Sequence, residues 1–358
     1  MFRARNLVFF IGLLFASAAL AQQGPIAIVI HGGAGTIRKS DMTQAQEAAY
    51  RQRLEEAVQA GYRVLSNGGK SLDAVQAAIT IMENSPLFNA GKGAVFTHEG
   101  TNEMDACIMD GTTLNAGAVS GVKHIRNPIL LARAVMDHSR HVLLYGDGAE
   151  AFAREQGFEM VENSYFRTEH RWNQLQDALK QDSYGMETEQ KPEEGSKQDD
   201  AGDGGNGDEG GGGGPDVDHL YSTVGAVALD RGGNIAAATS TGGLTNKRFG
   251  RIGDSPIVGA GTYANSQTAG ISGTGVGEYF MRQLVAYDIS ARMEYLGMSL
   301  KEAANAVVMD ELVKMDAPGG IIGLDHDGNI ATVFNTEGMY RAWIDKSGDM
   351  QVKIYKDE

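Results

Sequence analysis

The stretch TVGAVALD, residues 223–230, decides the fold of this 358-residue chain. It follows an acidic, glycine-rich tract and is apolar from its second residue onward, which predicts a buried strand that opens at Thr223. A second apolar run at residues 235–239 follows the turn DRGGN, so the two runs predict a β-hairpin. Taken alone, Thr223 has an ordinary explanation, because β-branched residues favour strands.

The same pattern returns near the C-terminus. Residues 321–324 and 330–334 flank the turn DHDGN and predict a second hairpin. Two helices are expected between the hairpins, and the second begins with a capping box in which Ser299 precedes Glu302 by three residues. Strands and helices thus come in groups along the chain and do not alternate one by one. This order predicts an α+β protein in which stacked sheets are covered by helices, rather than a parallel sheet built from alternating strands and helices.

Upstream of the acidic tract the sequence predicts further elements. An apolar strand at residues 26–30 runs into the glycine-rich loop HGGAG, residues 31–35. Apolar residues at helical spacing predict a helix over residues 43–66, and Ser71 is the expected cap of a second helix. The other expected elements are strands at residues 94–97 and 103–109 and a helix over residues 127–136.

The formal net charge of −15 is concentrated in one tract. Residues 182–218 contain twelve Asp or Glu residues and two Lys, so the rest of the chain is only mildly acidic. A nucleic-acid-binding protein needs a basic surface, which this acidic sequence does not predict. We therefore expect no nucleic-acid partner. Residues 185–217 combine acidic residues and glycine with almost no large apolar side chain, and this segment is therefore expected to be disordered.

Residues 1–21 have the pattern of a secretory signal peptide. Two arginines precede an apolar stretch that ends in the small-residue cleavage pattern Ala19-Leu20-Ala21. We expect cleavage after Ala21 and a periplasmic or secreted protein without a membrane anchor, because the apolar stretch is too short for a spanning helix. Cys107 is the single cysteine, so no disulfide can form within the chain.

Thr223 is the main candidate for chemistry. A threonine exposed by chain cleavage carries a hydroxyl nucleophile and a free α-amine on one residue, and this amine can act as the base. An α-amino group has a pKa of about 7.7–8.0, so it can accept and release a proton near neutral pH. A flexible tether that ends just before Thr223 suits a self-processed enzyme of two subunits, and it equally suits an ordinary interdomain linker.

Seven blocks of the sequence, in order and approximate spacing, resemble the isoaspartyl peptidase/plant-type L-asparaginase family. They are HGGAG at 31–35, FNAGKG at 88–93, MDA at 104–106, TVGAVALD at 223–230, STGG at 240–243, GRIGDSP at 250–256 and FNTEGMYR at 334–341. The likeness covers essentially the chain after residue 21 except the acidic tract. It implies an N-terminal-nucleophile hydrolase with a four-layer αββα sandwich and a threonine nucleophile.

The resemblance implies a precursor that cuts itself between Ser222 and Thr223. The products would be an α subunit, residues 22–222, and a β subunit, residues 223–358, which together form one structural domain and associate as a dimer of αβ units. Relatives usually have glycine where Ser222 stands. Because glycine permits a strained backbone at low steric cost, we expect serine to affect the rate of self-cleavage more than its occurrence.

The resemblance also assigns roles to five residues. Thr241 would hydrogen-bond to the nucleophile and orient it. Thr274 and Gly275 would form the oxyanion hole with one hydroxyl and one backbone N–H. Arg251 and Asp254 would bind the α-carboxylate and the α-ammonium of the substrate, although such a pair in an unrelated chain is usually a solvated salt bridge.

A loop around residue 89 completes the expected site. In relatives this loop approaches the nucleophile, so Asn89 is expected to bind substrate. The segment also resembles the family's sodium loop, in which mostly backbone oxygens hold the ion, with Glu83, Phe88 and Ala90 at matching positions. We therefore expect a structural Na⁺ and no catalytic cofactor, and the sequence has no clustered His and Cys spacing for zinc.

The expected function is the hydrolysis of small molecules, β-aspartyl (isoaspartyl) dipeptides and L-asparagine, with release of L-aspartate through a threonine acyl-enzyme. Two alternatives stay open at this point. The first is an aspartylglucosaminidase (glycosylasparaginase), which has the same fold and cuts the glycan–asparagine bond. The second is an unprocessed, catalytically silent protein that binds amino acids or peptides, in which Ser222 blocks cleavage.

Overall fold

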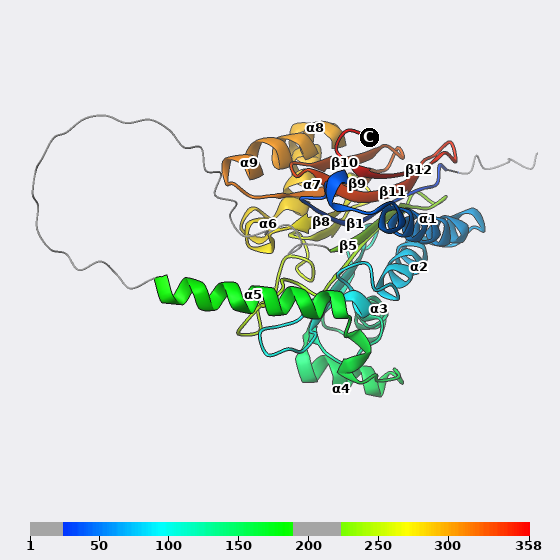
Figure 1. Ribbon diagram of the computed structural model, residues 1–358. Coiled ribbons are helices and arrows are strands. Elements are labelled where there is room, and N and C mark those ends of the chain that lie inside the picture. The colour runs from blue at the N-terminus through cyan, green and yellow to red at the C-terminus, as the bar shows by residue number, and fades with distance from the viewer. Residues whose placement is uncertain (1–23, 189–222) are drawn as a thin grey trace, which may run out of the picture.

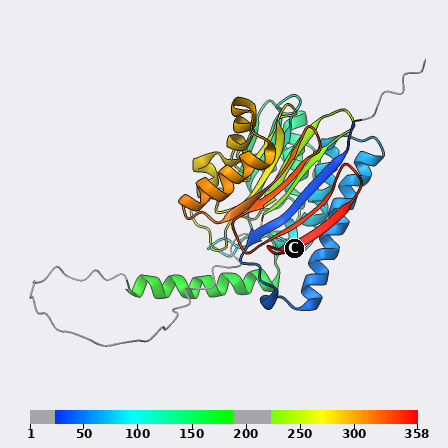
Figure 2. The same ribbon diagram turned by 90° about the horizontal axis from the view of Figure 1, so that it is seen from above.

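The computed structural model describes residues 24–188 and 223–358. These residues form two β-sheets that stack face to face and are covered on both outer sides by helices (Figure 1). Figure 2 shows the same layers from above, with the two sheets between the two sets of helices. This arrangement confirms the predicted α+β class and the αββα sandwich. None of the helices in the described ranges is long and apolar enough to cross a membrane.

The larger sheet has eight strands in the order β12-β11-β1-β5-β6-β2-β3-β4. Neighbouring strands are antiparallel except β3 and β4, which are parallel. Because β5 lies between β1 and β6, the strand that starts directly after Thr223 is hydrogen-bonded on both sides. The strands are Ala27–Gly35 (β1), Met104–Asp110 (β2), Ala116–Val122 (β3), Leu143–Tyr145 (β4), Val224–Leu229 (β5), Ile235–Thr241 (β6), Gly338–Ile344 (β11) and Met350–Tyr355 (β12).

The smaller sheet has four antiparallel strands in the order β10-β9-β8-β7. Its strands are Thr262–Ala264 (β7), Ala269–Gly275 (β8), Gly319–Asp325 (β9) and Ile330–Phe334 (β10). Both predicted hairpins are confirmed as β5–β6 and β9–β10. Apolar side chains from both sheets, including Val29, Val227 and Ile322, fill the layer between them. The two sheets therefore share one core, and the catalytic candidates lie at its edge.

Helices cover the two outer faces. The larger sheet packs against α1 (Gln44–Ser66), α2 (Ser71–Glu83), α3 (Pro128–His138) and α4 (Gly146–Glu155). The smaller sheet packs against α6 (Gly277–Gln283), α7 (Val285–Leu296), α8 (Leu300–Asn305), a π-helical segment (Ala306–Glu311) and α9 (Leu312–Lys314). The predicted capping box of Ser299 and Glu302 is present at the start of α8. Helix α5 (Glu169–Thr188) extends away from the layers (Figure 1).

Three expected elements differ in the structure. HGGAG is not a loop, because β1 continues through it to Gly35 with a bulge between His31 and Gly33, where it pairs with β11. Residues 94–97 form no strand and make only isolated bridges. Ser71 is the first residue of α2 rather than its cap, and its backbone N–H donates to the Asp230 carboxylate at 3.1 Å.

The acidic tract was expected to be disordered from residue 185. Helix α5 continues to Thr188, so residues 185–188 are helical. The rest of the predicted tract, Ser222 and the predicted signal peptide lie outside the described residues.

Candidate active site

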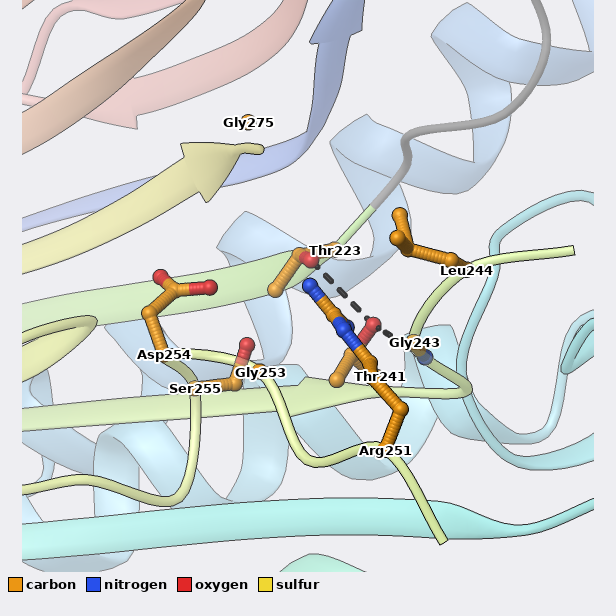
Figure 3. A pocket seen from close by; sticks show the side chains of 9 residues that line it. All are labelled: Thr223, Thr241, Gly243, Leu244, Arg251, Gly253, Asp254, Ser255 and Gly275. Atoms are coloured by element: carbon orange, nitrogen blue, oxygen red, sulfur yellow. Dashed lines mark hydrogen bonds between the residues drawn. The ribbon is translucent and has the colours of Figure 1, made fainter. Parts of the chain in front are cut away.

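A small pocket lies where β5, β6 and β8 meet the loop that follows residue 250 (Figure 3). It holds about 240 Å³ of empty space, part of it open to solvent. Nine residues line it: Thr223, Thr241, Gly243, Leu244, Arg251, Gly253, Asp254, Ser255 and Gly275. Five of the predicted site residues therefore come together here, although the sequence separates them into four segments.

Thr223 and Thr241 are joined directly. The Thr223 hydroxyl donates to Thr241 Oγ1 at 3.2 Å, as the dashed line in Figure 3 shows. Thr241 Oγ1 also accepts the Gly243 N–H at 3.0 Å, which fixes its position. The β5–β6 hairpin brings the two threonines together, because Val224 pairs with Ser240. The expected contact between the two threonines is therefore present, and their roles in catalysis stay predictions.

The predicted oxyanion hole lies at the end of β8. Thr274 is fully buried, and its Oγ1 accepts the Ala34 N–H at 3.4 Å, which leaves the hydroxyl hydrogen free to donate. Gly275 lines the pocket. A Cβ at Gly275 would lie 2.6 Å from the Pro318 carbonyl oxygen, so the close approach of the backbone requires glycine here.

Arg251 pairs with a residue that the sequence analysis did not assign. Its Nε and Nη2 donate to the two carboxylate oxygens of Glu278 at 2.8 and 2.7 Å. The paired arginine lowers the pKa of Glu278, which keeps that carboxylate ionised. Glu278 follows Gly275 by only three positions, but nothing in the sequence marks it as a partner of Arg251.

Asp254 is buried in the same pocket as Thr223, and no ion pair joins it to another side chain within residues 24–188 and 223–358. Its Oδ2 has no hydrogen-bond partner among the described residues. Burial raises the pKa of Asp254 to about 7, although the nearby Arg251 acts in the opposite direction. A carboxylate in this state is suited to receive an ammonium group, because the ligand would supply the ion-pair partner that the described residues do not give Asp254.

Asn89 lies behind the pocket rather than in its lining. Its side-chain amide donates to the Gly243 carbonyl at 2.8 Å, and its Oδ1 accepts the Val95 N–H at 2.9 Å. Its own carbonyl accepts the Gly242 N–H at 3.0 Å. These contacts hold the turn that follows Thr241, so Asn89 positions the site, and its contact with substrate stays a prediction.

The expected sodium ligands lie where α2 ends and in the turn that follows it: Glu83 is the last residue of α2, and Phe88 and Ala90 precede the 3₁₀ helix Gly91–Gly93. The turn folds back closely, since a Cβ at Gly91 would lie 2.3 Å from the Glu83 carbonyl oxygen. The carbonyls of Phe88 and Ala90 each accept one backbone hydrogen bond and retain a second lone pair. Neutral carbonyl oxygens of this kind are donors for monovalent cations, so the residues fit the predicted Na⁺. Across the described ranges, no three His, Cys, Asp or Glu residues are grouped as metal ligands.

Comparison with known proteins agrees with the geometry. The sequence matches the family Asparaginase_2, described as asparaginase, over residues 24–354. It is 48% identical over 335 residues to a protein of Escherichia coli K12 named isoaspartyl peptidase, covering 94% of this chain and 98% of the relative. An isoaspartyl peptidase of Salmonella typhimurium is 49% identical over 316 residues, 88% of this chain and 94% of the relative.

A more distant relative carries the other name of the family. A plant-type L-asparaginase of Pyrococcus furiosus is 41% identical over 321 residues, which cover 89% of this chain and 96% of the relative. The seven sequence blocks had predicted this relationship. This chain belongs to the Asparaginase_2 family of N-terminal-nucleophile hydrolases.

Proposed function

We propose that this protein is a self-activating hydrolase that releases L-aspartate from β-aspartyl dipeptides and from L-asparagine. The observation that carries the proposal is the hydrogen bond between Thr223 and Thr241 at the head of β5, in one pocket with Arg251 and Asp254. The names of the relatives, isoaspartyl peptidase and plant-type L-asparaginase, support the same substrates.

Activation begins with the peptide bond before Thr223. In the continuous chain the nitrogen of Thr223 is an amide and cannot serve as a base. The Thr223 hydroxyl attacks the Ser222 carbonyl, the chain shifts from the nitrogen to the oxygen, and water hydrolyses the resulting ester. The new α-amine on Thr223 then has the pKa range of a general base near neutral pH.

Substrate binding uses the two charged residues of the loop after residue 250. The substrate α-carboxylate binds Arg251 through Nη1, which the Glu278 pair leaves available. The substrate α-ammonium pairs with Asp254 and lowers its pKa, so that the buried carboxylate is ionised in the complex. These two contacts would turn the side-chain amide of the substrate toward Thr223.

The chemical step is acyl transfer. Thr223 Oγ attacks the side-chain carbonyl carbon while the amine of Thr223 takes the hydroxyl proton. The Thr274 hydroxyl and the Gly275 N–H donate to the developing oxyanion. The protonated amine gives its proton to the leaving ammonia or peptide amine, and the acyl-enzyme forms. Water then hydrolyses the ester and frees aspartate and Thr223.

We also propose three features that surround this chemistry. The backbone oxygens of Glu83, Phe88 and Ala90 would hold a structural Na⁺ that stiffens the loop carrying Asn89. Residues 1–21 would direct export, with cleavage after Ala21 and a periplasmic or secreted product. The processed αβ units would associate as a heterotetramer, as the resemblance implies.

The proposal is tested by measuring aspartate released from a β-aspartyl dipeptide and from L-asparagine. Wild-type protein should release aspartate from both, and the Thr223→Ala variant should release none. Activity confined to a glycosylasparagine would replace the proposal with an aspartylglucosaminidase. Failure of the wild type on all three substrates would favour the silent binding protein.

A further inference from the structure

Lys247 is a buried lysine that the proposed mechanism does not use. It lies in the loop between β6 and Arg251, and only 6% of its surface is exposed. Its Nζ donates to the backbone carbonyl of Glu103 at 2.8 Å, and within residues 24–188 and 223–358 no carboxylate forms an ion pair with it. An ammonium group has three hydrogens to donate, so Nζ retains donors beyond this contact.

The ammonium group of Lys247 lies against the wall of the pocket. Gly243 belongs to that wall. A Cβ at Gly243 would lie 3.1 Å from Lys247 Nζ and 3.6 Å from Arg251 Nη1. Figure 3 shows Gly243 next to the Arg251 side chain in the pocket. The two cationic groups therefore converge on the same face of Gly243, whose lack of a side chain leaves room for both.

Lys247 approaches the end of the Arg251 guanidinium that makes no ion pair with Glu278. The pair with Glu278 uses Nε and Nη2, whereas the atom nearest to the Cβ position of Gly243 is Nη1. Nη1 is also the atom to which the proposed function assigns the α-carboxylate of the substrate. Lys247 Nζ is thus placed near the point where that carboxylate would bind.

Two buried positive charges that converge in this way are costly without an anion. Burial lowers the pKa of Lys247, and the like charge of Arg251 acts in the same direction. The carboxylates of Asp105 and Glu103 oppose this effect, but neither is within ion-pair distance of Nζ. The Glu103 carboxylate is itself paired with Lys123 Nζ at 3.0 Å. A bound carboxylate would give Lys247 the partner that the described residues do not supply.

We propose that Lys247 binds the α-carboxylate of the substrate together with Arg251, with Nζ and Nη1 both donating to it. This inference rests on the proposed function, because it adds a second cation to the same carboxylate site. Two cations make a free α-carboxylate a strong requirement for binding. A β-linked aspartyl residue has this group free, whereas an α-linked one has it in the peptide bond. The pair would therefore select β-aspartyl peptides.

Two substitutions separate the charge of Lys247 from its contact with Glu103. Lys247→Gln removes the charge and offers an N–H donor for the Glu103 carbonyl. Lys247→Met removes both at similar volume. Isothermal titration calorimetry on self-cleaved protein should show the affinity for L-aspartate falling at least about tenfold in both variants. Neither variant should melt at a lower temperature than wild type, because each loses a buried charge that has no ion-pair partner.

Lys123→Gln is the matched control. It removes a positive charge that pairs with the side chain of the same Glu103 but does not line the pocket. Its affinity for L-aspartate should stay within about twofold of wild type. In steady-state kinetics with L-asparagine, Lys247→Gln should raise KM at least about tenfold and leave kcat within about twofold, because the carboxylate contact is the same before and during the chemical step. A residue that only supports the pocket would lower kcat as well.

A second ligand tests whether Lys247 acts on the carboxylate itself. In L-isoasparagine the α-carboxylate is replaced by an amide and the α-ammonium is kept. Its affinity should be the same within about twofold in wild type and Lys247→Gln. An equal loss for L-aspartate and L-isoasparagine would overturn the proposal, because it would show that the substitution disturbs the whole pocket.

The wild-type protein separates this inference from the proposed function. If wild type neither binds L-aspartate nor releases it from L-asparagine, the proposed function fails and the inference falls with it. If wild type does both, and Lys247→Gln and Lys247→Met bind L-aspartate as tightly as wild type, the proposed function stands and only the role of Lys247 is refuted.

Discussion

Arg251 and Glu278 form a two-pronged ion pair, with Nε and Nη2 each donating to one carboxylate oxygen at 2.8 and 2.7 Å. The pair uses Nε and Nη2 and does not involve Nη1, and Arg251 lines the pocket. Arginine retains much side-chain freedom when it is unpaired, so a partner that fixes it lowers the cost of binding a carboxylate. Glu278 is therefore expected to contribute to substrate affinity without contacting the substrate.

Substitution of Glu278 by Gln should raise KM about tenfold and change kcat little, because the loss falls on binding before the chemical step. Steady-state kinetics with L-asparagine measure both constants. Glu294→Gln, which removes an exposed carboxylate of α7, is the control and should leave both constants as in wild type. A fall in kcat at constant KM would show that Glu278 acts in the chemical step instead.

Asp254 should make the folded chain less stable as pH rises. Its folded pKa, about 7, lies above the ordinary aspartate pKa of 3.8, so the folded state binds more protons than the unfolded state between these values, and stability falls across that window. Asp254→Asn in the Thr223→Ala precursor should melt at a higher temperature than its parent at pH 8, with the difference shrinking toward pH 4. Thermal unfolding at several pH values measures this, and a constant difference would contradict it.

The same Asp254→Asn change in the cleavable chain should reduce kcat/KM for L-asparagine at least about 100-fold, because the partner of the substrate ammonium is lost. Stability and activity would then move in opposite directions at alkaline pH. Such a trade-off between stability and activity is expected where a buried charged group of the site has no partner until the ligand binds.

Thr274 should be required for the chemical step rather than for binding. Thr274→Val keeps the shape of the side chain but removes the hydroxyl that would donate to the oxyanion, and we expect kcat to fall about 10²–10³-fold with little change in KM. Thr274→Ser, which restores the hydroxyl, should recover most of the loss. If the valine variant keeps its activity, the oxyanion is stabilised by other groups.

Replacing Ser222 by Gly should accelerate self-cleavage. Glycine allows the backbone to adopt strained conformations before the scissile bond at lower cost, by up to about 1–3 kcal/mol, which corresponds to roughly a tenfold or greater gain in rate. The cleaved fraction is followed by gel densitometry after synthesis. A slower glycine variant would mean that the serine hydroxyl itself assists the reaction.

Much of the fold could be predicted from the sequence, because its hairpins have apolar runs and turn residues that act locally. The β5–β6 and β9–β10 hairpins and the capped start of α8 follow from such signals. Strand β8 could not be predicted, since Ala269–Gly275 has three glycines among seven residues and weak strand propensity. Its place between β7 and β9, and not its own sequence, makes it a strand.

The candidate site likewise divides into residues that the sequence predicts and contacts that only the fold reveals. The resemblance supplied Thr223, Thr241, Arg251 and Asp254, and the structure brings them into one pocket. The partner of Arg251 could not be found in this way, because an ion pair between residues 251 and 278 depends on how β8 and α6 return the chain to the loop. The contact between His31 Nε2 and Ser272 Oγ, which joins β1 to β8 at 3.0 Å, likewise has no local sequence pattern.

The central claim is that the chain cuts itself to expose Thr223, and intact-mass analysis with N-terminal sequencing tests it most directly. We expect purified wild-type protein to give two fragments, one of which begins Thr223-Val224-Gly225, while Thr223→Ala remains a single chain. A wild-type chain that stays uncut after prolonged incubation would contradict the claim and favour a silent binding protein.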